Sequence, residues 1–327
     1  MSISSTFTHN TDWPADTVEF APGYDDVLCL GTYLLHEATE TSPMSRSGKL
    51  SLLQLQPHSQ QHTVVLQEIA LGAVTDIKWR NRTVACSTAD GSIVIAELQQ
   101  TETDPLFLSR SAEAATAASG VLALALDWST NGDHIVVSHS DGSLAVLDVM
   151  TTSVLSASWL ACDFECWAVA WDRFSASVVY SGGDDGRWKI WDIRDSSSSS
   201  QTATFTSKRR DAGVTTISPS PHEEHLIAVG SYDSSVSLYD RRSPREPLTY
   251  STWAWHPAAS RKDTLLIACM HDGFKVCDTT GRVQLRFDEH QSLAYGVDWA
   301  RGPSHAEKPT IVASCSFYDH TLKIWAA

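Results

Sequence analysis

The sequence predicts an all-β fold, a seven-bladed β-propeller in which every blade is a four-stranded antiparallel sheet. Three observations predict it: one β-rich unit recurs along the chain, turns containing aspartate follow at intervals of about 40 to 50 residues, and tryptophan returns at one position of the unit. Intervals of that size are typical of propeller blades. The runs show no helical 3.6-residue period, which argues against a helical solenoid.

The repeated unit is clearest at residues 166–194, which read CWAVAWDR, SVVYSGGDDG and RWKIWDIR. Each unit contains three short runs rich in β-branched residues, and a looser fourth run follows them. Asp-Gly pairs separate the second run from the third in several copies, and this dipeptide favours a tight hairpin turn because both residues tolerate positive φ. These pairs are Asp141-Gly142, Asp185-Gly186 and Asp272-Gly273.

Seven copies of the unit lie between Thr17 and Ala327, so we expect residues 1–327 to form a single propeller domain. The serine-rich and alanine-rich stretches between strands are predicted to be loops that divide no domains. In most blades a tryptophan is predicted to end the first strand and to pack as core between blades. These tryptophans are Trp79, Trp128, Trp171, Trp255 and Trp299.

The seventh copy ends at its third strand, which leaves one strand of the ring to be supplied from elsewhere. Residues 2–8, which read SISSTFT, have the alternation of a strand. If this segment pairs with the last copy, the two ends of the chain meet in one blade and no sheet edge stays open. We therefore predict that the N-terminal strand closes the seventh blade.

Composition excludes several classes of partner. The formal net charge of −15 argues against nucleic-acid binding, which needs clustered Lys and Arg. The chain start lacks the pattern of a signal peptide, and nowhere do eighteen apolar residues run together, so we expect no membrane partner. Seven scattered cysteines without a CxxC pair predict neither a zinc site nor a disulfide framework. We expect a cytoplasmic protein with reduced thiols and with neither metal nor cofactor.

Propeller geometry predicts where a functional site lies. The turn between the second and third strands and the link into the next blade meet on one face, called here the upper face. Several upper-face segments are richer in His, Tyr and Ser than a turn requires. They are residues 31–33, 183–185, 231–233, 269–272, 289–292, 295–298 and 314–319. For His271, His290, Tyr295 and Ser316, a functional and a structural role are about equally favoured.

Eight segments carry a resemblance to a known family. In chain order they are DTVEFAP, LGTYLL, SGGDDGRWKIWDIR, GVTTISPSP, GSYD, IACMHDGF, EHQSLAYGVDW and SCSFYD, between Asp16 and Trp325. Together they resemble the diphthine methyl ester hydrolases, WD-repeat proteins of the diphthamide pathway. Blade six departs from the family pattern, because residues 250–252 lead directly to Trp253, and its first strand is expected to be shortened. Blade five lacks the usual histidine shortly before its Gly-Val, at residues 211–214.

The resemblance implies an enzyme that hydrolyses the methyl ester of methylated diphthine, a modified histidine on elongation factor 2, to give diphthine. Elongation factor 2 is therefore the implied partner, and we expect the protein to act on it as a monomer in the cytoplasm. A non-catalytic WD-repeat scaffold that docks a complex through the same face is the alternative, because propellers serve as binding platforms and as enzymes.

Ester hydrolysis needs an activated water or nucleophile, a base, and donors for the developing oxyanion. The chain contains no GxSxG and no HExxH motif, so the familiar esterase and zinc-hydrolase templates do not apply. His271 and His290 are the candidate bases, and Asp298 is the candidate that orients one of them. Ser316 is the candidate nucleophile, with direct attack by water as the alternative.

The substrate that the resemblance implies carries a trimethylammonium group, which cannot donate hydrogen bonds. Proteins hold such cations with aromatic faces and nearby carboxylates. Tyrosines beside aspartates on the upper face have this composition, and ordinary rim packing is the alternative for each tyrosine. The candidate substrate-binding residues are Tyr232, Asp233, Tyr295, Tyr318 and Asp319.

Overall fold

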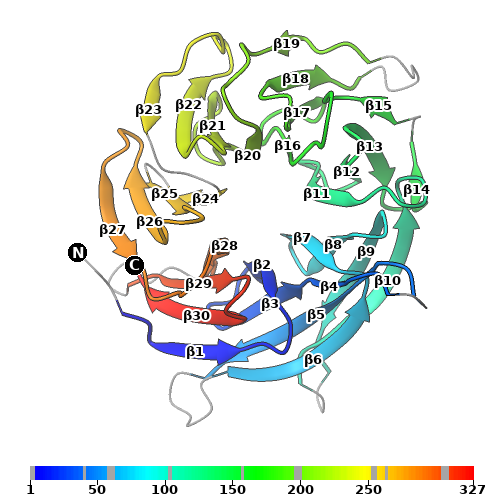
Figure 1. Ribbon diagram of the computed structural model, residues 1–327, viewed down its shortest axis with the longest axis vertical. Coiled ribbons are helices and arrows are strands. Elements are labelled where there is room, and N and C mark those ends of the chain that lie inside the picture. Colours follow the sequence, from blue (N-terminus) through cyan, green and yellow to red (C-terminus); the bar gives the residue numbers. More distant parts are fainter. Residues whose placement is uncertain are drawn as a thin grey trace.

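The chain folds into seven antiparallel sheets arranged as blades around a common axis (Figure 1). The computed structural model describes residues 4–39, 42–56, 63–101, 105–155, 158–194, 201–251, 256–261, 264–302 and 309–327. In each blade the first strand lies nearest the axis and the later strands follow outward, which confirms the predicted seven-bladed propeller. Among the described residues, no helix is long and apolar enough to cross a membrane.

Blades one to four follow one another along the chain. Blade one contains β2 (Ala15–Phe20), β3 (Val27–Thr32), β5 (Ser45–Leu55), β6 (Thr63–Leu71) and the short β4 (Leu34–His36), which pairs with β5. Blade two contains β7 (Val74–Arg80), β8 (Thr83–Thr88), β9 (Ser92–Gln99) and β10 (Phe107–Ala115). Blade three contains β11 (Ala123–Trp128), β12 (His134–His139), β13 (Ser143–Asp148), β14 (Ser153–Val154) and β15 (Trp159–Leu160). Blade four contains β16 (Ala168–Trp171), β17 (Val178–Gly182), β18 (Trp188–Asp192) and β19 (Phe205–Thr206).

Blades five to seven complete the ring. Blade five contains β20 (Val214–Pro219), β21 (Leu226–Ser231), β22 (Ser235–Asp240) and β23 (Thr249–Ser251). Blade six contains β24 (His256–Arg261), β25 (Thr264–Ala268), β26 (Phe274–Asp278) and β27 (Val283–Phe287). Blade seven contains β28 (Ala294–Trp299), β29 (Ile311–Ser316), β30 (Thr321–Ala326) and β1 (Phe7–Asn10).

The core consists of apolar clusters between neighbouring blades. Trp79 packs against buried residues of blade one, Trp128 against blade two, Trp171 against blade three and Trp299 against blade six. β-Branched and aromatic residues fit this setting because both faces of each inner sheet contact a neighbour. The structure confirms the predicted role of these four tryptophans. Trp255 lies outside the described residues.

The first strand of blade six differs from the expected one. It is β24, which begins at His256 and pairs with β25 in the register His256 to Ala268 and Arg261 to Thr264. The prediction that this strand ends at Trp255 is therefore wrong, because the strand begins after that residue. The expectation of a shortened strand is also wrong, since β24 and β2 both have six residues. The inner strand of blade six therefore includes His256 and Pro257 of the Trp-His-Pro sequence.

The N-terminal strand closes the ring, as predicted, although it starts later than residues 2–8. β1 pairs antiparallel with β30, with Phe7 opposite Ile324 and Asn10 opposite Thr321. The Phe7 side chain is 8 % exposed and lies in an apolar cluster with Leu322 and Ile324. Figure 1 shows β1 beside β30 as the outermost strand of blade seven.

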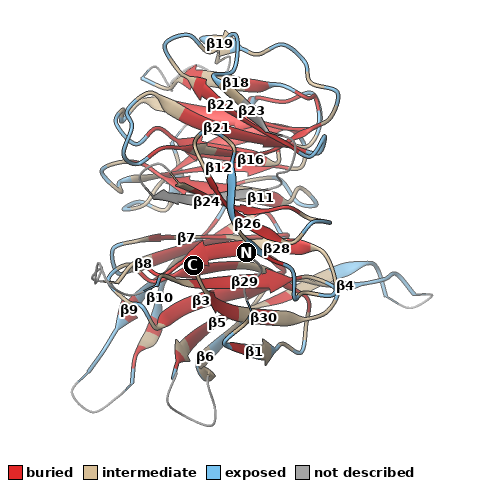
Figure 2. Ribbon diagram, turned by 90° about the vertical axis from the view of Figure 1, so that its left-hand side faces the viewer, coloured by how far each residue is buried: buried red, intermediate tan, exposed pale blue. Residues whose placement is uncertain are grey.

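Two further features position the site. A hairpin made by β4 and the start of β5 projects beyond the sheets on the upper face (Figure 2). At the axis, β28 and β2 approach each other closely at Gly296. A Cβ atom placed on Gly296 would lie 2.9 Å from both Thr17 Cα and Val18 N, so only glycine fits this contact between blades seven and one.

Candidate functional site at the upper mouth

His290 lies in a hydrogen-bond network inside blade seven. Its Nε2 shares a hydrogen bond of 2.9 Å with Ser314 Oγ, and its Nδ1 shares one of 3.0 Å with Thr321 Oγ1. Trp325 Nε1 donates to the same Ser314 Oγ, and Thr321 Oγ1 donates to Asp319. Only 2 % of the His290 side chain is exposed. Because both ring nitrogens already have partners within the blade, this environment favours a structural role for His290.

We expect His290→Ala to lower the free energy of unfolding by about 2–4 kcal/mol, since the change removes one hydrogen bond from each of Ser314 and Thr321 and leaves a cavity against Phe274 and Phe287. His271→Ala is the matched control, because His271 is exposed and its loss is expected to change stability by less than about 0.5 kcal/mol. Chemical denaturation of both variants measures this difference. Equal stability of the two variants would contradict the structural role.

Asp298 also makes structural contacts. It lies near the lower end of β28, where its Oδ2 accepts a hydrogen bond of 2.9 Å from Phe20 N in blade one. Glu19 makes the same kind of link to blade two, accepting from Trp79 N at 3.2 Å. Burial raises the pKa of Asp298, although Arg301 opposes this shift. The carboxylate thus joins two blades and does not lie beside a candidate base.

Ser316 lies at the upper end of β29, opposite Ala294, and is fully buried. Within the described part of the chain, its Oγ has no hydrogen bond of good geometry. Burial raises the pKa of neighbouring Asp319, but the nearby His290 and the hydrogen bonds from Gln291 N and the Thr321 hydroxyl outweigh burial and lower it. Asp319 therefore stays ionised within the network, and Ser316 is not open to a substrate in this conformation.

The remaining sequence candidates are accessible. His271 is exposed in the turn between β25 and β26, and Tyr232 is 41 % exposed in the turn between β21 and β22. Burial of its hydroxyl and the charge of Asp184 raise the pKa of Tyr232 to about 12. Asp233 Oδ1 accepts a hydrogen bond of 2.9 Å from Ser235 N, which is a turn-stabilising contact. Of these three, His271 and Tyr232 are both exposed in turns of the upper face, whereas the Asp233 carboxylate stabilises its own turn.

Four aromatic side chains from blades one and seven gather where the inner strands begin, a region called here the upper mouth. The Phe317 ring is central: its centroid lies 5.2 Å from that of Tyr295, 5.0 Å from that of Tyr318 and 6.1 Å from that of Tyr33. None of the four residues is fully buried, and Tyr318 is 67 % exposed. We call Tyr33, Tyr295, Phe317 and Tyr318 the aromatic group.

Asp16 lies beside the aromatic group. It precedes Thr17 on β2, and Tyr295 precedes Gly296 on β28, so the close approach of Thr17 and Gly296 makes Asp16 and Tyr295 neighbours. Loss of hydration raises the pKa of Asp16 well above the usual carboxyl range, and the charge of Asp76 raises it further. Burial, followed by the charge of Asp16, raises the pKa of Tyr295 in turn. A poorly hydrated carboxyl group thus faces partly exposed rings.

A second polar group belongs to the same mouth. Trp167, just before β16, donates from Nε1 to Asp184 Oδ1 at 2.9 Å, and Asp184 in turn acts on Tyr232. Burial raises the pKa of Asp184, and the charges of Glu165 and Asp185 add to this shift. The upper mouth therefore combines aromatic rings with two carboxyl groups that are hard to ionise.

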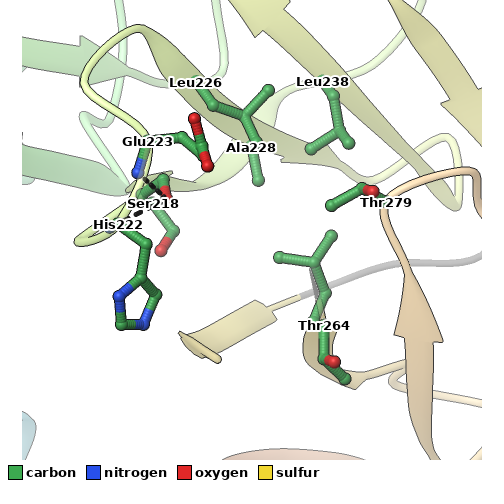
Figure 3. A pocket seen from close by; sticks show the side chains of 10 residues that line it. Ser218, His222, Glu223, Leu226, Ala228, Leu238, Thr264 and Thr279 are labelled. Atoms are coloured by element: carbon green, nitrogen blue, oxygen red, sulfur yellow. Dashed lines mark hydrogen bonds between the residues drawn. The ribbon is translucent and has the colours of Figure 1, made fainter. Parts of the chain in front are cut away.

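A cleft between blades five and six is not part of this site. Figure 3 shows Leu226, Ala228 and Leu238 facing Thr264 and Thr279 across it. These residues lie toward the lower ends of their blades, at the opposite end of the strands from the aromatic group. The cavity volume of about 20 Å³ has room for roughly one water molecule and not for a modified amino-acid side chain.

Three similar proteins carry the name diphthine methyltransferase, one of them as a homolog. The Dictyostelium discoideum protein is 31% identical over 97% of this chain and 98% of its own length. Those of Mus musculus and Homo sapiens are each 34% identical, over 92% and 90% of this chain and 70% and 74% of their own lengths. The chain belongs to the diphthine methyltransferase family. This finding confirms the family resemblance carried by the eight segments.

Two further comparisons concern the fold of this family member. The model of the WD domain, G-beta repeat, matches residues 199–240. A chain in the crystal structure of the mitotic checkpoint complex is similar with a TM-score of 0.74 at 14% identity, over 99% of this chain and 95% of that chain. At such low identity the likeness shows the propeller fold alone.

In this diphthine methyltransferase family member, sequence reasoning missed part of the upper mouth. Tyr33, Asp184 and Phe317 lay within the enriched segments but were not chosen, and Asp16 and Trp167 lay outside them. A signal was present: Asp16, Trp167 and Tyr295 each lie four residues before the aromatic residue that ends the first strand of their blade. In blade one the strand carries a bulge at this position, between Ala15 and Thr17.

No metal centre is found at this mouth, since the described residues contain no group of three or more His, Cys, Asp or Glu side chains that could hold a metal ion. The seven cysteines of the family member are all buried, and none of them forms a disulfide. The chemistry available at the mouth is therefore that of carboxyl groups, phenols, indole and the exposed imidazole of His271.

Proposed function

We propose that the chain hydrolyses the methyl ester of methylated diphthine on elongation factor 2, as a monomer in the cytoplasm. Membership of the diphthine methyltransferase family carries this proposal, because the likeness extends over nearly the whole chain. The upper mouth supports it, since aromatic rings beside Asp16 suit a substrate with a quaternary ammonium group. The reaction consumes one water and releases methanol and diphthine.

The relatives' name describes methyl transfer, which adds a methyl group, whereas hydrolysis of the ester removes one. The change in mass of the protein substrate distinguishes the two reactions. Hydrolysis removes the mass of one CH₂ from methylated-diphthine elongation factor 2 without any methyl donor. Methyl transfer adds the mass of one CH₂ to diphthine and requires a donor.

The proposed chemistry uses accessible groups first. His271 is the one predicted base that solvent reaches, so it is the first candidate to activate a water molecule. Ser316 is a weaker candidate for the nucleophile, because its hydroxyl is fully buried. Direct attack by water is accordingly the favoured route. Burial and neighbouring charges keep the Tyr295 phenol protonated, so its hydroxyl is able to donate a hydrogen bond to a developing oxyanion.

Exposed apolar side chains on the upper face suit a protein substrate. The hairpin of β4 and β5 projects there (Figure 2) and exposes Leu35 and Met44, and Phe164 is exposed in the link between blades three and four. Contacts of this kind hold a folded partner while one modified side chain enters the mouth. Elongation factor 2 is the partner that this proposal requires.

The experiment incubates the purified chain with methylated-diphthine elongation factor 2 and follows its mass. We expect the loss of one CH₂ per site, and we expect His271→Ala to slow it by at least about 10²-fold if His271 is the base. Ser316→Ala is expected to retain activity. Binding without any change of mass would support a scaffold instead, and gain of mass with a methyl donor would support transfer.

A further inference from the structure

One cluster at the upper mouth has the composition of a binding site for a cation that cannot donate hydrogen bonds. Tyr295, Phe317, Tyr318 and Tyr33 come from two blades, and their rings lie within 6.1 Å of the Phe317 centroid. Asp16 is the carboxyl group next to this cluster, held there by the close approach of β2 and β28 at Gly296. All four residues keep part of their surface exposed, so a ligand is able to reach the cluster.

We propose that the aromatic group and Asp16 form a quaternary ammonium subsite that positions the substrate for ester hydrolysis. The inference rests on the proposed function for the identity of the substrate, and on the geometry of these residues for the site. It assigns the counter-charge to Asp16, in place of Asp233 and Asp319, because those two carboxylates already cap a turn and serve the His290 network.

The chemistry of the ligand follows from what the cluster offers. Aromatic faces attract a cation through the ring quadrupole, and each ring contributes about 0.5–2 kcal/mol. A primary ammonium or guanidinium group would also need hydrogen-bond acceptors around it, whereas a trimethylammonium group needs only apolar faces and a diffuse negative charge. Asp16 supplies one such charge beside Tyr295. The cluster therefore suits a trimethylammonium group better than lysine or arginine.

Ionisation of Asp16 is coupled to this binding. The titratable groups that face it are Asp76 from β7, Tyr295 from β28 and Cys315 from β29. In the empty site Asp16 resists ionisation, because it has lost hydration and lies near Asp76. A bound cation favours the carboxylate, so affinity for the cation is expected to rise with pH through the raised pKa of Asp16 and then to level off.

The test compares choline with 3,3-dimethylbutan-1-ol, in which carbon replaces the charged nitrogen. Binding to the full chain is followed by NMR of the ligand methyl protons, whose resonance shifts upfield when aromatic rings surround them. We expect choline to bind at least about tenfold more tightly than the neutral alcohol, and Asp16→Asn to remove about tenfold of that preference. Tyr295→Leu is expected to weaken choline binding by about 2- to 30-fold and to reduce the upfield shift.

Two controls separate this site from general attraction to an acidic protein. Asp141→Asn removes one exposed charge from the upper face of blade three and is expected to leave choline binding unchanged. Asp16→Asn is expected to fold at least as stably as the original chain. A carboxyl group whose pKa is raised in the folded state destabilises that state above the ordinary carboxyl range, so its removal relieves a cost at neutral pH.

The outcomes distinguish this proposal from the proposed reaction. Tight choline binding that needs Asp16, without ester hydrolysis, would support the subsite and overturn the reaction. Equal binding of choline and the alcohol would overturn the subsite, whatever the activity. Loss of hydrolysis in Asp16→Asn with unchanged choline binding would also overturn it, because Asp16 would then act on the reaction step and not on the cation. For the protein substrate, a subsite role predicts that KM rises more than kcat falls.

Discussion

Deletion of residues 1–10 is expected to lower the melting temperature of the propeller by about 6–10 °C, the largest stability effect that we predict. The deletion removes β1, which exposes the backbone edge of β30 and takes Phe7 out of its apolar cluster. Loss of a buried phenylalanine alone costs about 3–5 kcal/mol. The open edge adds a tendency to associate with other chains. Calorimetry and light scattering of the truncated chain measure the two effects.

Point variants separate the contribution of the Phe7 side chain from the contribution of the covered edge of β30. Phe7→Ala is expected to reproduce most of the thermal loss while keeping the edge covered, so it should not promote association. Thr8→Ala is the matched control, because Thr8 is exposed and its hydroxyl accepts a hydrogen bond from the Lys323 side chain at the surface. An unchanged melting temperature after the full deletion would show that β1 does not close the ring in solution.

Gly296→Val is expected to have the second large effect, on stability and on activity together. The new Cβ would lie within 3 Å of backbone atoms of Thr17 and Val18, so β28 and β2 must separate. Overpacking of this kind costs about 1–3 kcal/mol. The separation also moves Asp16 away from Tyr295, and a misplacement of about 1 Å in a site can cost about 10²-fold in rate. Denaturation and the mass assay are the measurements.

Thr216→Val provides the control for Gly296→Val. Thr216 occupies the equivalent position on β20 in blade five and is already β-branched, so the substitution changes one atom and adds no bulk. We expect it to leave hydrolysis unaltered and to cost less stability than Gly296→Val, because it places no new atom against the backbone of a neighbouring blade. Gly296→Ala should fall between the two. Wild-type activity in Gly296→Val would show that the site does not depend on this blade contact.

Much of the fold could be predicted because most blades pack against their neighbours in the same way, with the same residue types at equivalent positions. A tryptophan such as Trp128 must fill the space between two sheets, and an Asp-Gly pair such as Asp141-Gly142 must turn the chain at positive φ. These demands recur in most copies, so the same residue types return at regular intervals along the sequence. Blade six was the exception, because β24 lies beyond the point where the period places it.

The site was harder to predict because its contacts join residues that lie far apart in the sequence. His290 and Asp298 stand out in the sequence as polar residues near turns, yet His290 is bonded to Ser314 and Thr321, and Asp298 to Phe20 N. None of these partners is adjacent in sequence. Asp16 gains its significance only beside Tyr295, which lies at the far end of the chain. Their predicted catalytic and binding roles stay predictions until the variants are assayed.

The pairing of β1 with β30 has a consequence for how the protein is made. Thr8 and Lys323, which touch in the finished ring, are 315 residues apart in sequence. A ribosome that adds about 5–20 residues per second needs on the order of 20–60 s to produce the second after the first. During that time β1 has no β30 to pair with, and blades one to six cannot form a closed ring. The ring therefore cannot close until β30 has been synthesised, and the nascent chain is exposed to misassembly before that point.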